Sequence, residues 1–225
     1  MSGPLLQMQG VHTHIGAYHI LHGVDLTVPA GQLTLLLGRN GAGKTTTLRT
    51  LMGLWRASAG QVFYQGHDIT CMPTPDIARL GIAYVPENMG IFPDLSVSEN
   101  MLLAARGARR LDQLDPIRLE QIFQLFPAVK QFWKHPAGKL SGGQKQMVAV
   151  ARAMIEPHDV LIIDEPSKGL APAIIDNMIE AFDRLKNAGV TILLVEQNLQ
   201  FARRLGDWVA VMEDRKSTRL NSSHT

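Results

Sequence analysis

The stretch from Gly38 to Thr46, GRNGAGKTT, has the composition and spacing of a loop that binds phosphate groups. It follows the pattern G-x-x-x-x-G-K-[ST], in which glycines allow backbone N–H groups to approach phosphate oxygens. We expect Lys44 to contact the β- and γ-phosphates of a nucleotide and the Thr45 hydroxyl to be a ligand of Mg²⁺. The predicted phosphate-binding residues are Gly38, Arg39, Asn40, Gly41, Ala42, Gly43, Lys44, Thr45 and Thr46.

A second candidate lies at the end of the apolar run Val160–Ile163, where Asp164 and Glu165 follow. An aspartate at the end of a buried strand can hold Mg²⁺ through water in proteins that have a phosphate-binding loop. A glutamate beside it is placed to orient or deprotonate an attacking water molecule. The alternative is a pair of strand-end carboxylates without a catalytic role, which the presence of the phosphate loop disfavours.

The stretch LSGGQKQ, Leu140–Gln146, indicates a second site for an anion. Ser141 and Gln144 have the spacing of a capping box, which predicts that a helix begins here. The exposed N–H groups and the dipole of a helix N-terminus favour an anion. We therefore predict that Ser141, Gly142, Gly143 and Gln144 form an anion-binding site. The alternative is an ordinary capped helix start.

Strands and helices alternate along the chain in an order typical of an α/β protein. Strands are predicted over 32–37, 61–64, 82–85, 160–164, 190–196 and 208–213, with further short strands between 5 and 37. Helices are predicted over 44–52, 114–126 and 174–185, and after the capping serines Ser96 and Ser141. Pro127 is expected to end the second of these helices. The helical region, about 88–158, is predicted to be an insertion in a core formed by about 5–87 and 159–213.

Composition places the chain among ordinary globular proteins. Its 225 residues are 45% hydrophobic and 19% charged, and a scattered net charge of +2 argues against nucleic-acid binding. No run approaches the about 18 apolar residues of a membrane span, and the N-terminus lacks the features of a signal peptide. The single cysteine, Cys71, excludes an internal disulfide, fits a reducing compartment and is expected to be a small core residue.

Four histidines near the N-terminus and three arginines near residue 107 are predicted to have no binding role. The histidines are expected to pack in strands or to face solvent rather than to bind a metal. The arginines are expected to form a solvated helix end. These residues are His12, His14, His19 and His22, and Arg106, Arg109 and Arg110.

The segment 214–225, DRKSTRLNSSHT, differs from the rest of the chain because Leu220 is its only apolar residue. It resembles the translation of a sequencing-library adapter. We therefore predict that it is a non-native tail that begins after Glu213. The alternative is a native disordered tail.

The stretches GRNGAGKTT, LSGGQKQ and VLIIDEP occur in the order that characterises the ATP-binding-cassette (ABC) ATPases, and over about residues 5–213 the chain resembles this family. The resemblance implies an α/β fold with a P-loop NTPase core, an N-terminal antiparallel β-subdomain and an inserted helical subdomain, together one domain over 1–213. It also implies ATP and Mg²⁺ as cofactors. In this family two cassettes dimerise head to tail, so that the LSGGQ stretch of one subunit faces the ATP on the phosphate loop of the other.

Three further stretches, IFPDLSVSEN, SKGLAP and LLVEQN, resemble the ATPase subunit of branched-chain amino acid importers. Glu87 stands where most cassettes have a glutamine that binds Mg²⁺ and positions water; a carboxylate can bind the metal but cannot donate as an amide does. Gln197 stands where most have a histidine near the γ-phosphate, and its charge does not change near neutral pH. The resemblance thus implies that Glu87 is a metal ligand and that Glu87, Glu165 and Gln197 are catalytic. Ile15 aligns with the aromatic residue that stacks on adenine, and Tyr18 is nearby.

The resemblance further implies an ATP-hydrolysing subunit of an importer for branched-chain or other amino acids, peripheral to the cytoplasmic face of the cell membrane. The expected partners are membrane-spanning permease subunits and a second ATP-binding subunit, identical or different. A periplasmic or extracellular solute-binding protein would act indirectly, and no nucleic acid is expected. The expected permease-docking surface is Glu87–Pro93, with Met89, Ile91 and Phe92. The alternatives are a non-transport cassette, which usually has two cassettes or a long coiled coil, and a stand-alone P-loop kinase, which has no use for LSGGQ.

Overall fold

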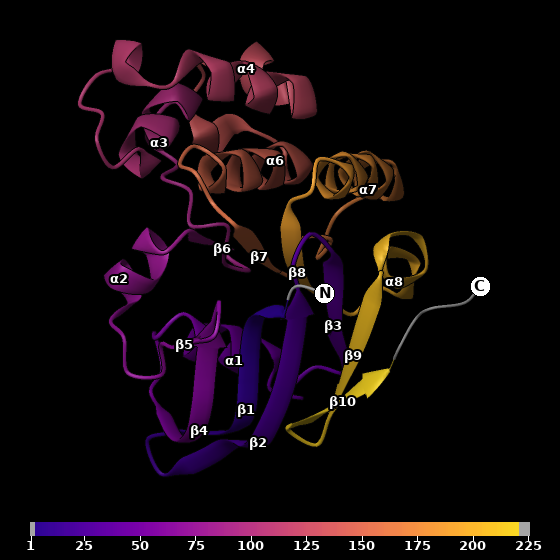
Figure 1. The fold of residues 1–225 in the computed structure, drawn as a ribbon. Coiled ribbons are helices and arrows are strands. Elements are labelled where there is room, and N and C mark those ends of the chain that lie inside the picture. Colours follow the sequence, from indigo (N-terminus) through magenta and orange to yellow (C-terminus); the bar gives the residue numbers. More distant parts are fainter. Residues whose placement is uncertain (1–2, 221–225) are drawn as a thin grey trace.

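The computed structural model describes residues 3–220, apart from the side chains of Leu199, Ala202 and residues 217–220. Within this range the strands form two sheets, an antiparallel one in the order β2-β1-β4-β5 and a larger one in the order β10-β9-β3-β8-β7-β6. Figure 1 shows the antiparallel sheet at the bottom, the larger sheet in the middle and a layer of helices at the top. The strands are Pro4–Ile15 (β1), Tyr18–Pro29 (β2), Leu33–Gly38 (β3), Ala57–Tyr64 (β4), His67–Asp68 (β5), Ile82–Val85 (β6), Val160–Asp164 (β7), Thr191–Glu196 (β8), Trp208–Glu213 (β9) and Lys216–Leu220 (β10).

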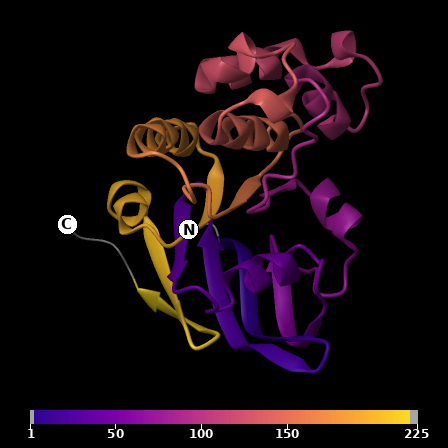
Figure 2. The same cartoon turned by 180° about the vertical axis from the view of Figure 1, so that it is seen from behind.

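The helices are concentrated between β6 and β7, as the sequence predicted. Figure 2 shows the same layered arrangement from behind, with α1 on the side of the antiparallel sheet and α6 and α7 on the other side of the larger sheet. The α-helices are Lys44–Leu51 (α1), Thr74–Arg79 (α2), Val97–Ala104 (α3), Pro116–Leu125 (α4), Pro127–Gln131 (α5), Gly142–Ala153 (α6), Pro172–Asn187 (α7) and Leu199–Leu205 (α8). Short 3₁₀ helices span Leu111–Gln113 (η1) and Ala137–Lys139 (η2).

The centre of the larger sheet is parallel, because β3 pairs with β8 and β9 in parallel and β7 pairs with β6 and β8 in parallel. Every residue of β7 and β8 is buried, as expected for strands that are covered on both faces. Successive residues point to opposite faces. Leu161 packs into the cluster that includes residues of α6 and α7. Its neighbour Ile162 packs into the cluster that includes residues of α1 and the antiparallel sheet.

This parallel arrangement determines where the functional side chains lie. The carboxyl ends of β3, β7 and β8 lie at one edge of the sheet. The loops that carry GRNGAGKTT, DEPS and EQN follow these ends directly. Three stretches that are far apart in the sequence therefore converge at this edge, which is the usual ligand-binding edge of an open α/β sheet.

One detail of the predicted elements was wrong. Residues 5–37 form long strands rather than several short ones, because the glycines between them allow bulges and close approach instead of breaks. Gly10 lies at a shift in the register between β1 and β2 and has a φ angle of 54°. A Cβ atom at Gly60 of the neighbouring strand β4 would lie 2.2 Å from the Gly10 carbonyl oxygen, so that position requires glycine. The helix before Pro127 ends as predicted, since α4 stops at Leu125. Pro127 also begins α5, because proline is favoured in the first turn of a helix.

The segment 214–225, which is predicted to be a non-native tail, contains the strand β10. Asp214 and Arg215 have φ angles of 46° and 65°, and this tight turn leads into β10, which pairs antiparallel with β9. The edge of β9 offers unpaired backbone groups, so even a polar segment can extend the sheet there. Residues 221–225 lie outside the described part of the chain. The adapter origin of this segment stays a prediction.

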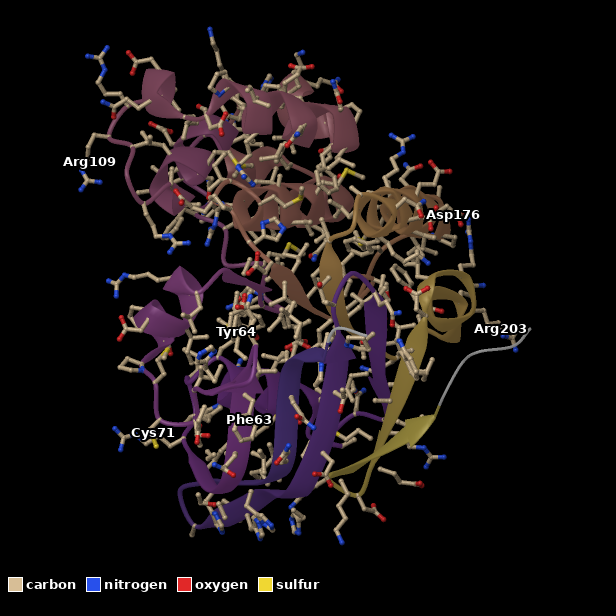
Figure 3. All side chains as sticks on the ribbon, viewed as in Figure 1. Phe63, Tyr64, Cys71, Arg109, Asp176 and Arg203 are labelled. Atoms are coloured by element: carbon tan, nitrogen blue, oxygen red, sulfur yellow. The ribbon has the colours of Figure 1, made fainter. Side chains whose placement is uncertain are left out.

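Cys71 is exposed, which contradicts its predicted place in the core. It lies in the segment between β5 and α2, and Figure 3 shows it at the edge of the molecule. Arg109 is also exposed, in the loop after α3, which agrees with the predicted solvated cluster. The N-terminal histidines pack against one another: the ring of His19 stacks on those of His14 and His22, with centroids 4.2 and 4.1 Å apart.

Candidate functional site

The phosphate loop connects β3 to α1 and is held by close backbone contacts. A Cβ atom at Gly38 would lie 2.6 Å from the carbonyl oxygen of Met212 in β9, so this position requires glycine. Gly43 has a φ angle of 101°, a left-handed conformation that glycine adopts freely, and α1 begins at the next residue. The Lys44 ammonium donates to the carbonyl oxygens of Gly38 at 2.9 Å and Arg39 at 3.1 Å. The lysine side chain therefore folds back along its own loop.

Glu165 joins the three converging loops. Its Oε1 atom lies 3.2 Å from Lys44 Nζ and accepts a hydrogen bond from Gln197 Nε2 at 2.7 Å. The same Gln197 nitrogen donates to Asn40 Oδ1 of the phosphate loop at 2.6 Å. The Lys44 and Glu165 side chains are only 4% and 9% exposed, so water screens this pair weakly. The structure thus brings together residues whose predicted roles came from three separate sequence motifs.

Asp164 lies beside this group as a buried carboxylate. Neither of its carboxylate oxygens has a hydrogen-bond partner among the described residues. Burial raises the pKa of Asp164 to about 6; the nearby Thr45 hydroxyl opposes this shift, and the charges of Glu165 and Glu87 add to it. A buried carboxylate without a partner is destabilised, and a cation would relieve it. Asp164, with Thr45 next to it, therefore fits a site for a divalent metal ion, for which oxygen ligands are preferred.

Glu87, two residues after β6, is held at the same edge by a residue that the sequence reasoning did not single out. Lys168, in the loop after β7, forms a short ion pair with the Glu87 carboxylate. The hydrogen bond to Glu87 raises the pKa of Lys168. The Lys168 ammonium also lies 3.9 Å from Glu165 Oε2. No sequence signal predicted this pairing, because a lysine in a polar loop ordinarily faces solvent.

Glu196, the last residue of β8, is a second buried carboxylate that the sequence reasoning missed. It is 2% exposed and accepts hydrogen bonds from Ser167 N at 2.9 Å, Ser167 Oγ at 2.8 Å and Gln197 N at 3.1 Å. Burial raises its pKa, and these hydrogen bonds oppose the shift. Glu196 therefore fixes the loop after β7 against the loop that carries Gln197. Its position at the end of an apolar strand, the signal that identified Asp164, could have identified it.

The LSGGQ stretch begins α6 with the predicted capping box. Gln144 N donates to Ser141 Oγ at 3.3 Å, and Ser141 N donates to Gln144 Oε1 at 2.9 Å. Ser141 and Gly142 are exposed, whereas Gly143 is packed against α7: a Cβ atom there would lie 2.3 Å from Ile174 Cγ2. Figure 1 places α6 and α1 on opposite sides of the larger sheet. The two predicted anion sites of this chain are therefore not brought together.

A cavity of about 620 Å³ adjoins the phosphate loop. It is lined by Gly38–Ala42, by His22 of β2 and by Val211–Arg215 at the end of β9. This volume lies in the range of small-molecule and cofactor sites. Neither Ile15 nor Tyr18 lines the cavity, and Tyr18 is 75% exposed. Contact of either residue with adenine stays a prediction.

A parallel sheet whose carboxyl edge presents a glycine-rich phosphate loop, a buried strand-end aspartate and a glutamate held by the loop lysine defines a P-loop nucleotide-binding protein. The family described as "ABC transporter" matches residues 21–168, and the chain belongs to this family. The predicted family, the α/β cassette fold and the assignment as an ATPase of the ABC transporter class are thereby confirmed.

Curated relatives cover most of the chain. It is 39% identical to the high-affinity branched-chain amino acid transport ATP-binding protein BraG of Pseudomonas aeruginosa, over 93% of this chain and 89% of that protein. It is 39% identical to the probable branched-chain amino acid transport ATP-binding protein LivF of Archaeoglobus fulgidus, over 84% of this chain and 80% of that protein. The ribose import ATP-binding protein RbsA of Bacillus subtilis is 28% identical over 94% of this chain and 44% of that protein.

Among solved structures, the chain is similar to an ATP-binding cassette of an ABC transporter in its ADP conformation, with a TM-score of 0.81 and 26% identity over 97% of this chain and 91% of the other. A nucleotide-free cassette gives a TM-score of 0.82, also at 26% identity and with the same coverage. The chain is therefore a nucleotide-binding cassette. Among residues 3–220, no helix has the length and apolar character needed to cross a bilayer.

Proposed function

We propose that this chain is the ATP-hydrolysing subunit of an importer for branched-chain or other amino acids. The observation that carries the proposal is the contact of Lys44, Glu165 and Gln197 at one carboxylate oxygen, which joins the phosphate loop to a poised carboxylate. Two relatives that are 39% identical are described as branched-chain amino acid transport ATP-binding proteins, and this similarity supports the choice of solute class. We treat residues 1–213 as one domain, with the helical insertion at about 88–158 and the segment 214–225 as an added tail.

The phosphates of ATP would lie over Gly38–Thr46, where the backbone N–H groups and the N-terminus of α1 face the loop. Lys44 would exchange its two carbonyl acceptors for phosphate oxygens, since an ammonium group interacts more strongly with a charged acceptor. Thr45, Asp164 and Glu87 would hold Mg²⁺, which neutralises charge on the phosphates. The buried Asp164 carboxylate without a partner supports this ligand set.

Glu165 is proposed as the base that orients and deprotonates the attacking water. Its left-handed backbone, with a φ angle of 46°, and the hydrogen bond from its N–H to Val195 O at 2.9 Å fix the carboxylate at the edge of the sheet. Gln197 holds Oε1 and would donate to the γ-phosphate once ATP displaces that contact. Because an amide does not titrate, this contact should not depend on pH near neutrality.

The separation of the two anion sites supports a dimer. Ser141 and Gly142 are exposed at the start of α6, and Figure 1 places α6 on the other side of the larger sheet from α1, which directly follows the phosphate loop. We propose that Ser141, Gly142, Gly143 and Gln144 contact the ATP held by a second ATP-binding subunit, identical or different. A helix N-terminus with free N–H groups is suited to this contact.

Permease subunits would dock between the core and the helical insertion. A cavity of about 430 Å³ lies there, lined by Tyr84, Met89 and Arg152 among others. Met89 and Ile91 pack partly against the core, so Phe92, at 48% exposed, is the accessible apolar residue of the predicted surface. The Arg152 guanidinium lies 5.5 Å from the centre of the Phe92 ring. This docking would place the subunit at the cytoplasmic face of the membrane, with a solute-binding protein as an indirect partner and no nucleic acid.

The test is ATP-dependent dimerisation of the Glu165→Gln variant, followed by light scattering with and without MgATP. Loss of the base should trap ATP between two subunits, and the further change Ser141→Arg should abolish the dimer. If the Glu165→Gln variant stays monomeric with MgATP while the wild-type protein hydrolyses ATP, the proposal is contradicted and a stand-alone P-loop kinase is favoured. Assembly with ATP but without any effect of reconstituted permease subunits on turnover would favour a non-transport cassette.

A further inference from the structure

The ion pair between Glu87 and Lys168 joins two loops at the metal-binding edge of the site. Glu87 follows β6 and Lys168 follows β7, and the Lys168 ammonium contacts the Glu87 carboxylate directly. The same ammonium lies 3.9 Å from Glu165 Oε2. The Lys168 ammonium thus lies within ion-pair distance of both Glu87 and Glu165, two of the three carboxylates that are assigned to magnesium binding and catalysis.

The two lysines of the site differ in how firmly they are held. Lys44 is 4% exposed and donates to two backbone carbonyl oxygens, so its position is fixed by the phosphate loop. The Lys168 side chain is 60% exposed and contacts only carboxylates in the described structure. A long exposed lysine side chain leaves such a pair readily, because water screens exposed charges and an exposed ion pair contributes little stability.

We propose that Lys168 is a built-in competitor of Mg²⁺: it neutralises Glu87 in the nucleotide-free protein and must release this carboxylate when MgATP binds. This inference rests on the proposed function and adds to it a residue that sets the magnesium requirement. The single negative charge of Glu87 can balance either the Lys168 ammonium or Mg²⁺, but not both. Because an ammonium and a divalent ion repel each other, the cation that arrives with ATP displaces the one that is already there.

The expected effect is a lower magnesium requirement when Lys168 loses its charge. In Lys168→Met, the free Mg²⁺ concentration that half-saturates binding of a non-hydrolysable ATP analogue should fall by up to about fivefold, the upper limit that corresponds to one exposed ion pair. Lys168→Arg keeps the charge and should resemble wild type. In a Glu87→Gln background the same Lys168→Met change should have much less effect, since the amide does not form the ion pair.

The measurement is calorimetric titration of the analogue over a series of free Mg²⁺ concentrations, with the ATPase rate as a second readout. The matched control is Lys130→Met, which removes an equally exposed lysine, 61% exposed and paired with Glu120 at 3.5 Å, far from the site. A midpoint that is equal in Lys168→Met and Lys130→Met, or that rises in Lys168→Met, would overturn the inference. If wild type shows no magnesium-dependent nucleotide binding at all, the proposed function itself fails.

Discussion

Replacing Asp164 with asparagine should stabilise the nucleotide-free protein although it removes a proposed metal ligand. The side chain is fully buried, and neither carboxylate oxygen has a partner among the described residues. Burial raises its pKa from 3.8 to about 6. Because the folded protein disfavours the ionised form, the destabilisation is absent below the unfolded pKa of 3.8 and complete above the folded pKa of about 6.

The shift sets the size of the effect. At 1.36 kcal/mol for each pKa unit, the ionised Asp164 destabilises the fold by about 3 kcal/mol at about pH 7.5. The same linkage gives about half of this at about pH 5 and less than about 1 kcal/mol at about pH 4. The asparagine side chain has nearly the same shape and no charge, so the free energy of unfolding of the Asp164→Asn variant should exceed that of wild type by up to these amounts.

The assay is urea unfolding of both proteins without nucleotide at these three pH values, followed by tryptophan fluorescence and circular dichroism. The gain in stability should shrink as the pH falls, and saturating MgATP should stabilise wild type more than the variant. Asp94→Asn, a change at an exposed aspartate, is the matched control and should show no such trend. A variant no more stable than wild type at pH 7.5, or a gain that does not depend on pH, would refute the reasoning.

Two other predictions concern the packing of α6 and the docking surface. Gly143→Ala should destabilise the fold by about 1–3 kcal/mol in urea unfolding, because the new Cβ atom would lie 2.3 Å from Ile174 Cγ2. This clash outweighs the about 1 kcal/mol that alanine gains over glycine in a helix. The second change Ile174→Ala should restore part of the lost stability. Phe92→Asp should abolish transport in a reconstituted transporter and leave ATP binding unchanged, whereas Ile117→Asp, at another exposed apolar residue, should transport normally.

Much of the fold could be predicted because its local signals agree with its tertiary structure. The run Val160–Asp164 is wholly apolar up to its last residue, and only a strand covered on both faces buries every side chain. The capping box at Ser141 uses a hydrogen-bond pattern local to four residues, so sequence alone was sufficient to locate the start of α6. The β1–β2 region was predicted less well, because Gly10 and Gly23 lie at shifts of register within continuous strands, where a local pattern suggests that the strands break.

The two residues missed at the site both have roles that depend on pairings between distant loops; the strand-end position of Glu196 was a usable signal for its location but not for its partner, and Lys168 had no signal of either kind. Glu196 contacts Ser167, 29 residues earlier in the chain, and Lys168 pairs with Glu87, which precedes it by 81 residues. Sequence spacing identifies a residue whose partners are its own neighbours or a ligand of known shape. It does not identify a counter-ion that the fold brings from another strand.

Asp164, Glu87 and Lys168 together indicate why the nucleotide-free site is not optimised for stability. A carboxylate destabilised by about 3 kcal/mol is relieved when a cation binds, and this relief is equivalent to more than a hundredfold in metal affinity. An ion pair at Glu87 acts in the opposite direction, because it already satisfies that carboxylate before the metal arrives. The affinity for the metal therefore depends on two opposed effects. The buried Asp164 carboxylate favours metal binding because it has no partner in the nucleotide-free protein, and the Glu87–Lys168 ion pair opposes it. Asp164→Asn should lower the affinity for Mg²⁺, and Lys168→Met should raise it.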